Sequence, residues 1–374
     1  KMDTTRQISL FEESDAVRLI DEIRILIDTE DLGKSFYERL VSRIGIKLLD
    51  LENFENNTFN VVTELTYKNG EEEFRPDITL LINGIPLIFI EVKKPNNRDG
   101  ILDERDRLNR RFQNKKFRKF VNLTQFMIFS NNMEYENEDV DTLQGAFYAT
   151  TSYHKPMFNY FREEQNNLAD NLLPENEETE NFVLQDNNLV VIKHSAEFLT
   201  NKNSATPTNR IITSLCSKDR VKFILKYAIA YVDVTDEIEK HIMRYPQIFA
   251  TKAIEAKINE GVKKGIIWHT QGSGKTALAF YNVRFLTDVF QKKEIVPKFY
   301  FIVDRLDLLI QAQKEFKSRG LIVHTVNSKQ EFADDIKKVG VIHNHSGKNE
   351  ITVVNIQKFS EDSNVVSKDN YDVS

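Results

Sequence analysis

The chain has 374 residues, of which 40% are hydrophobic and 29% are charged, with 26 Phe. This composition builds hydrophobic cores and excludes a disordered chain. The formal net charge of −6 argues against a uniformly basic nucleic-acid coat but allows a local basic patch. A single cysteine, Cys216, excludes a disulfide scaffold and suits a reducing compartment. With no apolar run near the roughly 18 residues of a membrane span and no signal peptide, we expect a cytoplasmic, multidomain protein without membrane association.

The first part of the chain predicts an α/β unit over residues 1–162. Apolar residues at helical spacing predict helices over 14–29 and about 35–44. Runs rich in β-branched and aromatic residues predict four strands, over 59–67, 77–82, 85–93 and 125–132. A basic helical stretch lies between the last two strands.

A change in composition marks the next segment. Residues 163–188 contain eight acidic residues and no Lys or Arg, which predicts a solvated connector, assigned here to 163–215. Helix and strand signals then alternate over 216–374. Helices are predicted at 218–232, 246–261, 275–290 and 306–319, and strands at 265–269, 298–303, 321–326 and 351–356. This alternation favours a parallel sheet with helices on both faces.

Three charged residues mark the ends of the apolar runs between residues 75 and 95. Asp77, Glu91 and Lys93 all occupy odd positions, whereas the aliphatic residues of both strands are mostly even. Because side chains alternate faces along a strand, even-with-even pairing would collect the charges on one face. A three-residue loop, 82–84, gives that pairing and sets Asp77 opposite Phe89, diagonally next to Glu91.

Two carboxylates so placed predict a metal site. Oxygen ligands with open water positions suit Mg²⁺, which lowers the pKa of a bound water and neutralises charge that builds on a phosphate. Lys93 could orient the water or stabilise the developing charge. Asp77, Glu91 and Lys93 are thus the predicted catalytic residues for phosphodiester hydrolysis. The alternative is a surface ion pair, since Glu-x-Lys also occurs at 255–257.

The stretch after this hairpin is strongly basic. Residues 93–119 hold eleven basic and four acidic residues, which predicts a surface that follows DNA phosphates, with a solvated helix face as the alternative. The interleaved phenylalanines at 112, 117 and 120 are interpreted as core anchors. The candidate DNA contacts are Arg105, Arg110, Arg111, Lys115 and Lys116.

A second functional site, a nucleotide-binding site, is predicted at residues 266–280, IIWHTQGSGKTALAF. An apolar strand, a Gly-rich turn and a helix form a phosphate loop, in which backbone amides wrap phosphate oxygens. Gly272, Ser273 and Gly274 form the turn that would bind the phosphates of ATP. Lys275 would reach the β- and γ-phosphates, and Thr276 would hold Mg²⁺. His269 replaces the first Gly of the full pattern.

These motifs resemble known families. Pro76-Asp77 and Glu91-Val92-Lys93 resemble the PD-(D/E)xK nuclease superfamily, in which the carbonyl corresponding to that of Val92 often completes the metal shell and a helix acid sometimes joins, here Glu38 or Glu64. The loop at 269–276 resembles that of superfamily 2 helicases. In that resemblance Gln247 corresponds to the adenine-sensing Gln, and the segments holding Arg305 and Lys358 correspond to motifs that contact the DNA strand.

Together, the motif order resembles the restriction (R) subunit of type I restriction-modification enzymes. This resemblance implies a PD-(D/E)xK nuclease domain, a mixed sheet flanked by helices, followed by a RecA-like helicase lobe with a parallel sheet. It also implies Mg²⁺-dependent DNA cleavage coupled to ATP-driven translocation on double-stranded DNA. The methyltransferase (modification) and specificity subunits would be separate partner chains.

Two departures from the family pattern stand out. The family's Gln-x3-Tyr motif is absent after Lys93, and Arg105 or Asn109 would take its place. No DEAD-type acidic motif follows the phosphate loop, so we expect an N-terminal fragment with an incomplete first motor lobe. Two other functions stay open: a nuclease–helicase of recombination or repair, and an ATP-binding assembly module with a vestigial nuclease.

Overall fold

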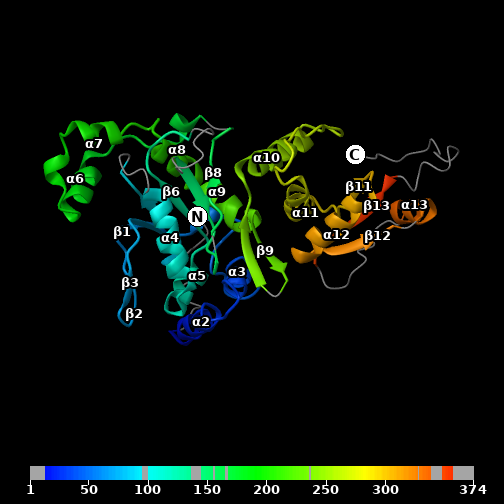
Figure 1. Ribbon diagram of the computed structural model, residues 1–374, viewed down its shortest axis with the longest axis horizontal. Coiled ribbons are helices and arrows are strands. Elements are labelled where there is room, and N and C mark those ends of the chain that lie inside the picture. The colour runs from blue at the N-terminus through cyan, green and yellow to red at the C-terminus, as the bar shows by residue number, and fades with distance from the viewer. Residues whose placement is uncertain are drawn as a thin grey trace. The chain divides into compact units, whose positions relative to one another are not determined.

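The computed structural model divides by its internal contacts into two compact units, 1–226 and 227–374 (Figure 1). Each unit is described by itself. The structure describes residues 13–94, 100–135, 145–154, 156–164, 167–235, 237–326, 328–337 and 348–356. The predicted α/β class is confirmed, because both units combine helices with sheets. No helix in the described part of the chain is long and apolar enough to cross a membrane.

The first unit is built on a six-stranded mixed sheet in the order β1-β4-β5-β6-β7-β8. The β5–β6 pair is parallel and the other pairs are antiparallel. A separate antiparallel hairpin consists of β2 and β3. The strands are β1 Phe59–Thr63, β2 Tyr67–Asn69, β3 Glu72–Phe74, β4 Ile78–Ile82, β5 Ile85–Val92, β6 Phe126–Ser130, β7 Ala146–Ala149 and β8 Asn159–Tyr160.

Helices and 3₁₀ turns accompany this sheet. Both predicted N-terminal helices are present, although they end earlier than expected. The α-helices are α2 Glu13–Leu26, α3 Lys34–Leu40, α4 Gly100–Gln113, α5 Arg118–Leu123, α6 Glu177–Asp186, α7 Ala196–Asn201, α8 Pro207–Leu215 and α9 Lys218–Phe223. The 3₁₀ turns are η1 Phe54–Asn56, η2 Lys115–Phe117, η3 Leu168–Asn171 and η4 Val190–Ile192.

The start of α3 needs a glycine. Gly33 has φ 79° and caps the helix. A Cβ at this position would lie 2.5 Å from the carbonyl oxygen of Asn122, a distance that no side chain tolerates. Asn122 is buried, and its side-chain amide donates to the carbonyls of Ile27 and Thr29. These contacts fix α3 and the end of α2 against α5.

An aromatic cluster forms much of the core beside the sheet. Phe74, Phe89 and Phe120 have ring centroids 5.0–5.7 Å apart. Phe112 and Phe117 are also buried, so the interpretation of these phenylalanines as core anchors is confirmed. Each buried side chain of this size contributes about 1.5–3 kcal/mol relative to an exposed one. The contact between the rings of Phe120 and Phe89 holds α5 against β5.

The β4–β5 hairpin turns differently from the prediction. The turn has two residues, Asn83 and Gly84, because Ile82 pairs with Ile85. Both turn residues have a positive φ, 51° and 77°, as a two-residue type I′ turn requires. The predicted three-residue loop is therefore wrong, since the Asn-Gly dipeptide meets the backbone demand of the shorter turn.

A β-bulge in the middle of the hairpin then shifts the register. After the shift Ile78 pairs with Ile90, so even positions face even positions, as predicted. Continued by one residue, this register sets Asp77 opposite Glu91. Phe89, the predicted partner of Asp77, is therefore wrong. The turn is one residue shorter than predicted, and the bulge adds an unpaired residue within the hairpin strands.

The acid-rich segment after residue 163 folds into short helices that belong to the first unit. Glu177 and Glu180 of α6 lie 3.0 and 3.7 Å from the ammonium of Lys193. Lys202 pairs with Glu175 and Glu180 at 3.0 and 2.7 Å. Local ion pairs thus offset part of the charge that the sequence concentrates here. The domain boundaries at 162 and 215 stay predictions.

The second unit contains a parallel three-stranded sheet in the order β11-β13-β12, and α12 contacts all three strands. An antiparallel hairpin pairs β9 with β10. A π-helix turn, η5 Ile224–Ala228, includes the boundary between the two units at residue 226. The elements that follow are β9 Ile229–Val234, β10 Glu237–Ile242, α10 Tyr245–Asn259, α11 Lys275–Gln291, β11 Tyr300–Val303, α12 Leu306–Ser318, β12 Ile322–Thr325, α13 Lys329–Lys337 and β13 Glu350–Asn355.

Two predicted elements of this region are wrong. The helix expected over 218–232 continues past Phe223 as the π-helix turn η5 and ends at Ala228. Residues 229–234 instead form a strand that pairs with β10, because tertiary pairing overrides helical spacing in a run rich in Val, Ile and Tyr. Residues 265–269, expected to form a strand, have no regular secondary structure and pair with none of the described strands, and Ile266 and Trp268 are each 91% exposed. A strand requires a hydrogen-bonded neighbour, and the three described parallel strands pair with one another.

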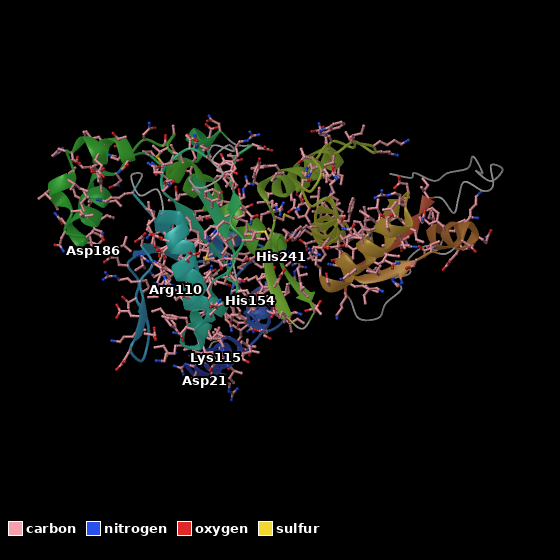
Figure 2. All side chains as sticks on the ribbon, in the orientation of Figure 1. Asp21, Arg110, Lys115, His154, Asp186 and His241 are labelled. Atoms are coloured by element: carbon pink, nitrogen blue, oxygen red, sulfur yellow. The ribbon has the colours of Figure 1, made fainter. Side chains whose placement is uncertain are left out.

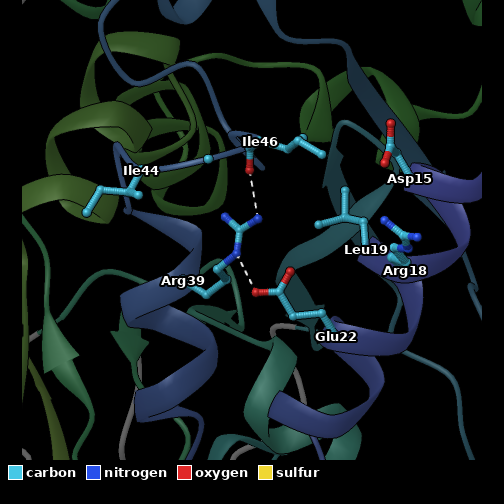
Figure 3. Close-up of a pocket in the computed structure, with 8 residues that line it drawn as sticks. Asp15, Arg18, Leu19, Glu22, Arg39, Ile44 and Ile46 are labelled. Carbon is cyan, nitrogen blue, oxygen red and sulfur yellow. Dashed lines mark hydrogen bonds and ion pairs between the residues drawn. The ribbon is translucent and has the colours of Figure 1, made fainter. Parts of the chain in front are cut away.

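An open pocket lies between α2 and α3 (Figure 3). Arg39 of α3 crosses it, with Nε 2.8 Å from Glu22 and Nη2 donating to the carbonyl of Ile46 at 2.7 Å. None of the predicted site residues lines this pocket. We interpret these contacts as packing between the two helices.

Candidate functional sites

The end of the β4–β5 hairpin brings two of the predicted carboxylates together. Asp77 directly precedes β4, and Glu91 is the last buried residue of β5. The carboxylate Oδ2 of Asp77 accepts a hydrogen bond of 2.7 Å from the backbone N–H of Val92. That bond joins the start of one strand to the end of the other.

Glu91 is buried, and its Oε1 has no hydrogen-bond partner among the residues that the structure describes. The pKa of Glu91 is raised to about 8, mainly by burial and also by the negative charges of Asp77 and Glu104, against the opposing effect of Lys93. A buried carboxylate oxygen without a donor is costly. Such strong perturbation by burial and neighbouring charge is typical of functional sites.

Lys93 lies between two carboxylates. Its ammonium Nζ is 3.3 Å from Glu91 Oε2 and 3.3 Å from Glu104 Oε2. Burial lowers the pKa of Lys93, but the charges of Glu104, Glu91 and Asp77 outweigh this effect and raise the pKa overall. The ammonium is therefore held in its charged form at the edge of the carboxylate pair.

Glu104 of α4 is a member of this cluster that the sequence prediction missed. It is buried, and its carboxylate also lies 3.5 Å from Arg107 and 3.7 Å from Arg111. The guanidinium of Arg111 in turn stacks on the ring of Phe74, 3.8 Å from its centroid. The signal in the sequence was helical spacing, since Arg107 and Arg111 follow Glu104 by three and seven residues on one helix face.

The donor set fits a hard divalent cation with open water positions. Asp77 and Glu91 supply carboxylate oxygens, and Glu91 Oε1 is an acceptor that lacks a partner. Within the described ranges, no group of three or more His, Cys, Asp or Glu side chains could hold a metal ion. Neither Glu38 of α3 nor Glu64, which follows β1, therefore completes such a group, and Glu64 lies 3.7 Å from Arg75. A site with few protein ligands suits Mg²⁺, which keeps several waters.

The predicted DNA contacts divide into two kinds. Arg110 and Lys115 are exposed on the side of the unit formed by α4 and η2 (Figure 2), and Lys115 lies 3.5 Å from Glu30. Lys116 is also exposed, and Arg105 pairs with Asp106 at 3.3 Å. Arg111 differs, because it is engaged with Glu104 and Phe74 inside the cluster. DNA contact by these residues stays a prediction.

The phosphate loop of the second unit has the backbone that its glycines allow. Gly272 and Gly274 have φ 76° and 82°, and Gly274 caps the start of α11. The ammonium of Lys275 donates to the carbonyls of His269 and Thr270 at 3.0 and 2.9 Å. The lysine thus lies over its own loop, where a phosphate would replace carbonyl oxygens as its acceptor.

The remaining groups of the loop include polar atoms without partners. Ser273 Oγ and His269 Nδ1 are buried and have no hydrogen-bond partner. Thr276 lies in the first turn of α11, at the positive end of the helix dipole. Unpaired donors at a helix N-terminus fit an anionic ligand such as a nucleotide phosphate.

Gln247 of α10 contacts this loop. Its Oε1 accepts from the backbone N–H of Arg244 at 2.9 Å, and its Nε2 donates to the carbonyl of Gly274 at 2.9 Å. The side chain is buried. Because both amide atoms have protein partners, the geometry favours a role in holding the phosphate loop over a direct contact with adenine.

The two remaining predicted DNA contacts are placed differently. Arg305 is exposed at the start of α12 and lies 3.4 Å from Asp307. Lys358 lies outside the described residues. Both stay predictions.

Comparison with known proteins gives the family of each unit. The family described as "Type I restriction enzyme R protein N terminus" matches residues 3–140. The family described as "Type III restriction enzyme, res subunit" matches residues 240–373. The first match contains the whole carboxylate cluster, and the second contains the phosphate loop.

Individual relatives match across both units. A putative type I restriction enzyme endonuclease subunit of Methanocaldococcus jannaschii is 28% identical over 327 residues, which cover 84% of this chain and 26% of that protein. A type I restriction enzyme endonuclease subunit of Staphylococcus aureus is 25% identical, over 84% of this chain and 28% of that protein. One from Staphylococcus saprophyticus is 27% identical, over 77% and 26%. The chain spans about a quarter of the length of these relatives. It belongs to the family of R (endonuclease) subunits of type I restriction enzymes.

Proposed function

We propose that the first unit is a PD-(D/E)xK nuclease domain that hydrolyses DNA phosphodiester bonds with Mg²⁺. The observation that carries this proposal is the buried Glu91, whose Oε1 lacks a partner while Asp77 and Lys93 lie beside it. A structural ion pair would satisfy its carboxylate. Here one oxygen is left for a cation.

Each residue of the cluster has a distinct role in this proposal. Asp77 and Glu91 hold the metal with their carboxylates, and the carbonyl of Val92 joins them. When bound, Mg²⁺ supplies an activated water and neutralises charge on the scissile phosphate. The ammonium of Lys93 stabilises negative charge on the phosphate oxygens, because it remains protonated between its acidic neighbours.

We further propose that the second unit is a RecA-like lobe of an ATP-driven motor. Lys275 binds the β- and γ-phosphates, and Thr276 holds the Mg²⁺ of the nucleotide. The support is the loop geometry, with positive φ at two glycines and a lysine that has only backbone carbonyls as acceptors. Gln247 maintains the loop through its bond to Gly274.

The complete protein would then translocate double-stranded DNA and cut it, in complex with modification and specificity subunits. Family membership and the relatives that are named endonuclease subunits support this assembly. The exposed basic residues of α4 and η2 are the proposed DNA contacts near the nuclease site. We retain 1–162, 163–215 and 216–374 as the proposed nuclease domain, connector and motor lobe.

The test uses the full-length subunit reconstituted with its modification and specificity partners. Circular plasmids carrying the target sequence, either methylated or unmethylated, are incubated with Mg²⁺ and ATP. We expect cleavage of the unmethylated circle alone. Cleavage that requires a free DNA end and ignores methylation would support a recombination or repair nuclease, and absence of cleavage in every condition would support an assembly module.

A further inference from the structure

Glu104 occupies an unusual environment for a carboxylate on a basic helix. It is buried to 4% exposure, and both of its oxygens face cations. Oε2 lies 3.3 Å from Lys93 and 3.5 Å from Arg107, and Oε1 lies 3.7 Å from Arg111. Three cationic side chains therefore surround this buried carboxylate.

Arg111 and the aromatic core fix the position of Glu104. Arg111 contacts Glu104 on one side and stacks on Phe74 on the other, 3.8 Å from the ring centroid. Phe74 is itself buried and packs against Phe89 in β5. A continuous set of contacts therefore connects the core of the sheet to the carboxylate that faces Lys93.

The contacts of Lys93 show what this arrangement does. Its ammonium has two carboxylate neighbours at the same distance, Glu91 and Glu104. If Glu91 coordinates a metal, its oxygens are no longer available to the lysine. Glu104 is not suited to replace Glu91 as a ligand, since three cations surround it and would repel a divalent ion.

We propose that Glu104 is a positioning residue that shares the Lys93 ammonium with Glu91 and keeps it when Glu91 binds a divalent cation. This inference rests on the proposed nuclease function and deepens it. Without Glu104, Lys93 has Glu91 as its remaining carboxylate partner among the described contacts, and the ammonium competes with the metal for the same oxygens. Glu104 therefore acts on the metal through Lys93 and does not coordinate it.

The test measures Mn²⁺ binding to the 374-residue chain by isothermal titration calorimetry, a readout that needs no DNA cleavage. EDTA-stripped protein is titrated as the unsubstituted chain, as Glu104→Gln, as Lys93→Met and as the double variant. Asp103→Asn is the matched control, because Asp103 is an exposed acid on the same helix. The same titrations are run with Thr276→Ala to remove the proposed metal-binding hydroxyl of the phosphate loop.

We expect Glu104→Gln to weaken Mn²⁺ binding by about tenfold, the usual lower bound for loss of a group that orients a metal site. In the Lys93→Met background the same change should weaken binding by less than about threefold, because the competing ammonium is gone. Asp103→Asn should bind as the unsubstituted chain does. Glu104→Asp, which keeps the charge, should recover part of the lost affinity, and it replaces Glu104→Gln if that variant does not fold.

Three results would overturn this role. An equal loss in both backgrounds would mean that Glu104 acts on the metal directly or through the fold. Unchanged affinity in Glu104→Gln would mean that Lys93 needs no second anchor. If the unsubstituted chain binds no Mn²⁺ outside the phosphate loop, the proposed nuclease site fails, and the role of Glu104 fails with it.

Discussion

Asp77 Oδ2 accepts a 2.7 Å hydrogen bond from the backbone N–H of Val92, across the open end of the β4–β5 hairpin. Val92 directly follows Glu91 in β5, so this bond directs the Asp77 carboxylate toward the end of β5. The β-bulge makes it possible, because it shifts the register that the two-residue turn would otherwise impose.

The hairpin turn provides a stability prediction. Asn83 has a positive φ, its Oδ1 accepts from the N–H of Thr58 at 2.8 Å, and its Nδ2 donates to the carbonyl of Leu48 and to Asn57. We expect Asn83→Gly, which keeps the turn conformation and loses these bonds, to lower the free energy of unfolding by about 1–3 kcal/mol.

Asn83→Ala should cost about 1 kcal/mol more than Asn83→Gly, since it also places a Cβ in the left-handed region. Urea denaturation of the two variants and the unsubstituted chain measures both effects. Equal stability of the Gly and Ala variants would show that the backbone conformation at residue 83 carries no cost.

The raised pKa of Glu91 predicts a pH dependence of stability in the absence of divalent metal. Its folded-state pKa is about 8, against an ordinary value of 4.5, so between these values the folded state keeps a proton that the unfolded state has lost. Stability from this group is fully present below pH 4.5 and is lost as pH rises toward 8.

Comparison with Glu91→Gln isolates this effect, because the amide does not titrate. We expect the Tm of the unsubstituted chain, relative to that of Glu91→Gln, to fall as pH rises from 5 to 8 in EDTA and to level off above pH 8. Differential scanning calorimetry at each pH provides the measurement. If the Tm of the unsubstituted chain, relative to that of Glu91→Gln, stays constant or rises over this pH range, the burial of this carboxyl is contradicted.

The contacts of Gln247 predict its effect on nucleotide binding. Because its amide atoms are bonded to Arg244 and Gly274, Gln247→Ala should loosen the phosphate loop and weaken ATP and GTP binding by similar factors. Displacement of a fluorescent nucleotide from the 374-residue chain measures both affinities. Gln291→Ala, at the exposed end of α11, is the control. A loss confined to ATP would instead support adenine recognition by Gln247.

The sequence predicted the parts of the fold that local pattern determines. The strands at 77–93 and the helices at 245–259, 275–291 and 306–318 follow from periodicity and from Gly and Pro positions. Even positions do pair with even positions as predicted, but the β-bulge produces this register and the predicted three-residue loop does not. The contribution of α4 to the carboxylate cluster depends on tertiary contacts, which the sequence pattern does not show. Glu104 was therefore interpreted as one of the acidic residues in a basic stretch.

The failures have the same physical origin. The β-bulge in β5 leaves no signal in the pattern, because a shift of one residue is compensated inside the strand. Residues 229–234 have helical spacing as well as high β-propensity, and pairing with β10 decides between them. The segment at 265–269 has the composition of a strand, but its hydrogen-bonding neighbour cannot be read from its own residues.

We propose that DNA cleavage takes place at the carboxylate cluster and ATP hydrolysis at the phosphate loop. The most direct measurement assays plasmid cleavage and ATPase activity together on the full-length subunit, reconstituted with its partners, as Glu91→Gln and as Lys275→Ala. We predict that Glu91→Gln abolishes cleavage and keeps full ATPase activity, whereas Lys275→Ala abolishes ATPase activity and, with it, the translocation on which cleavage depends. Cleavage at the unsubstituted rate by Glu91→Gln would contradict the account.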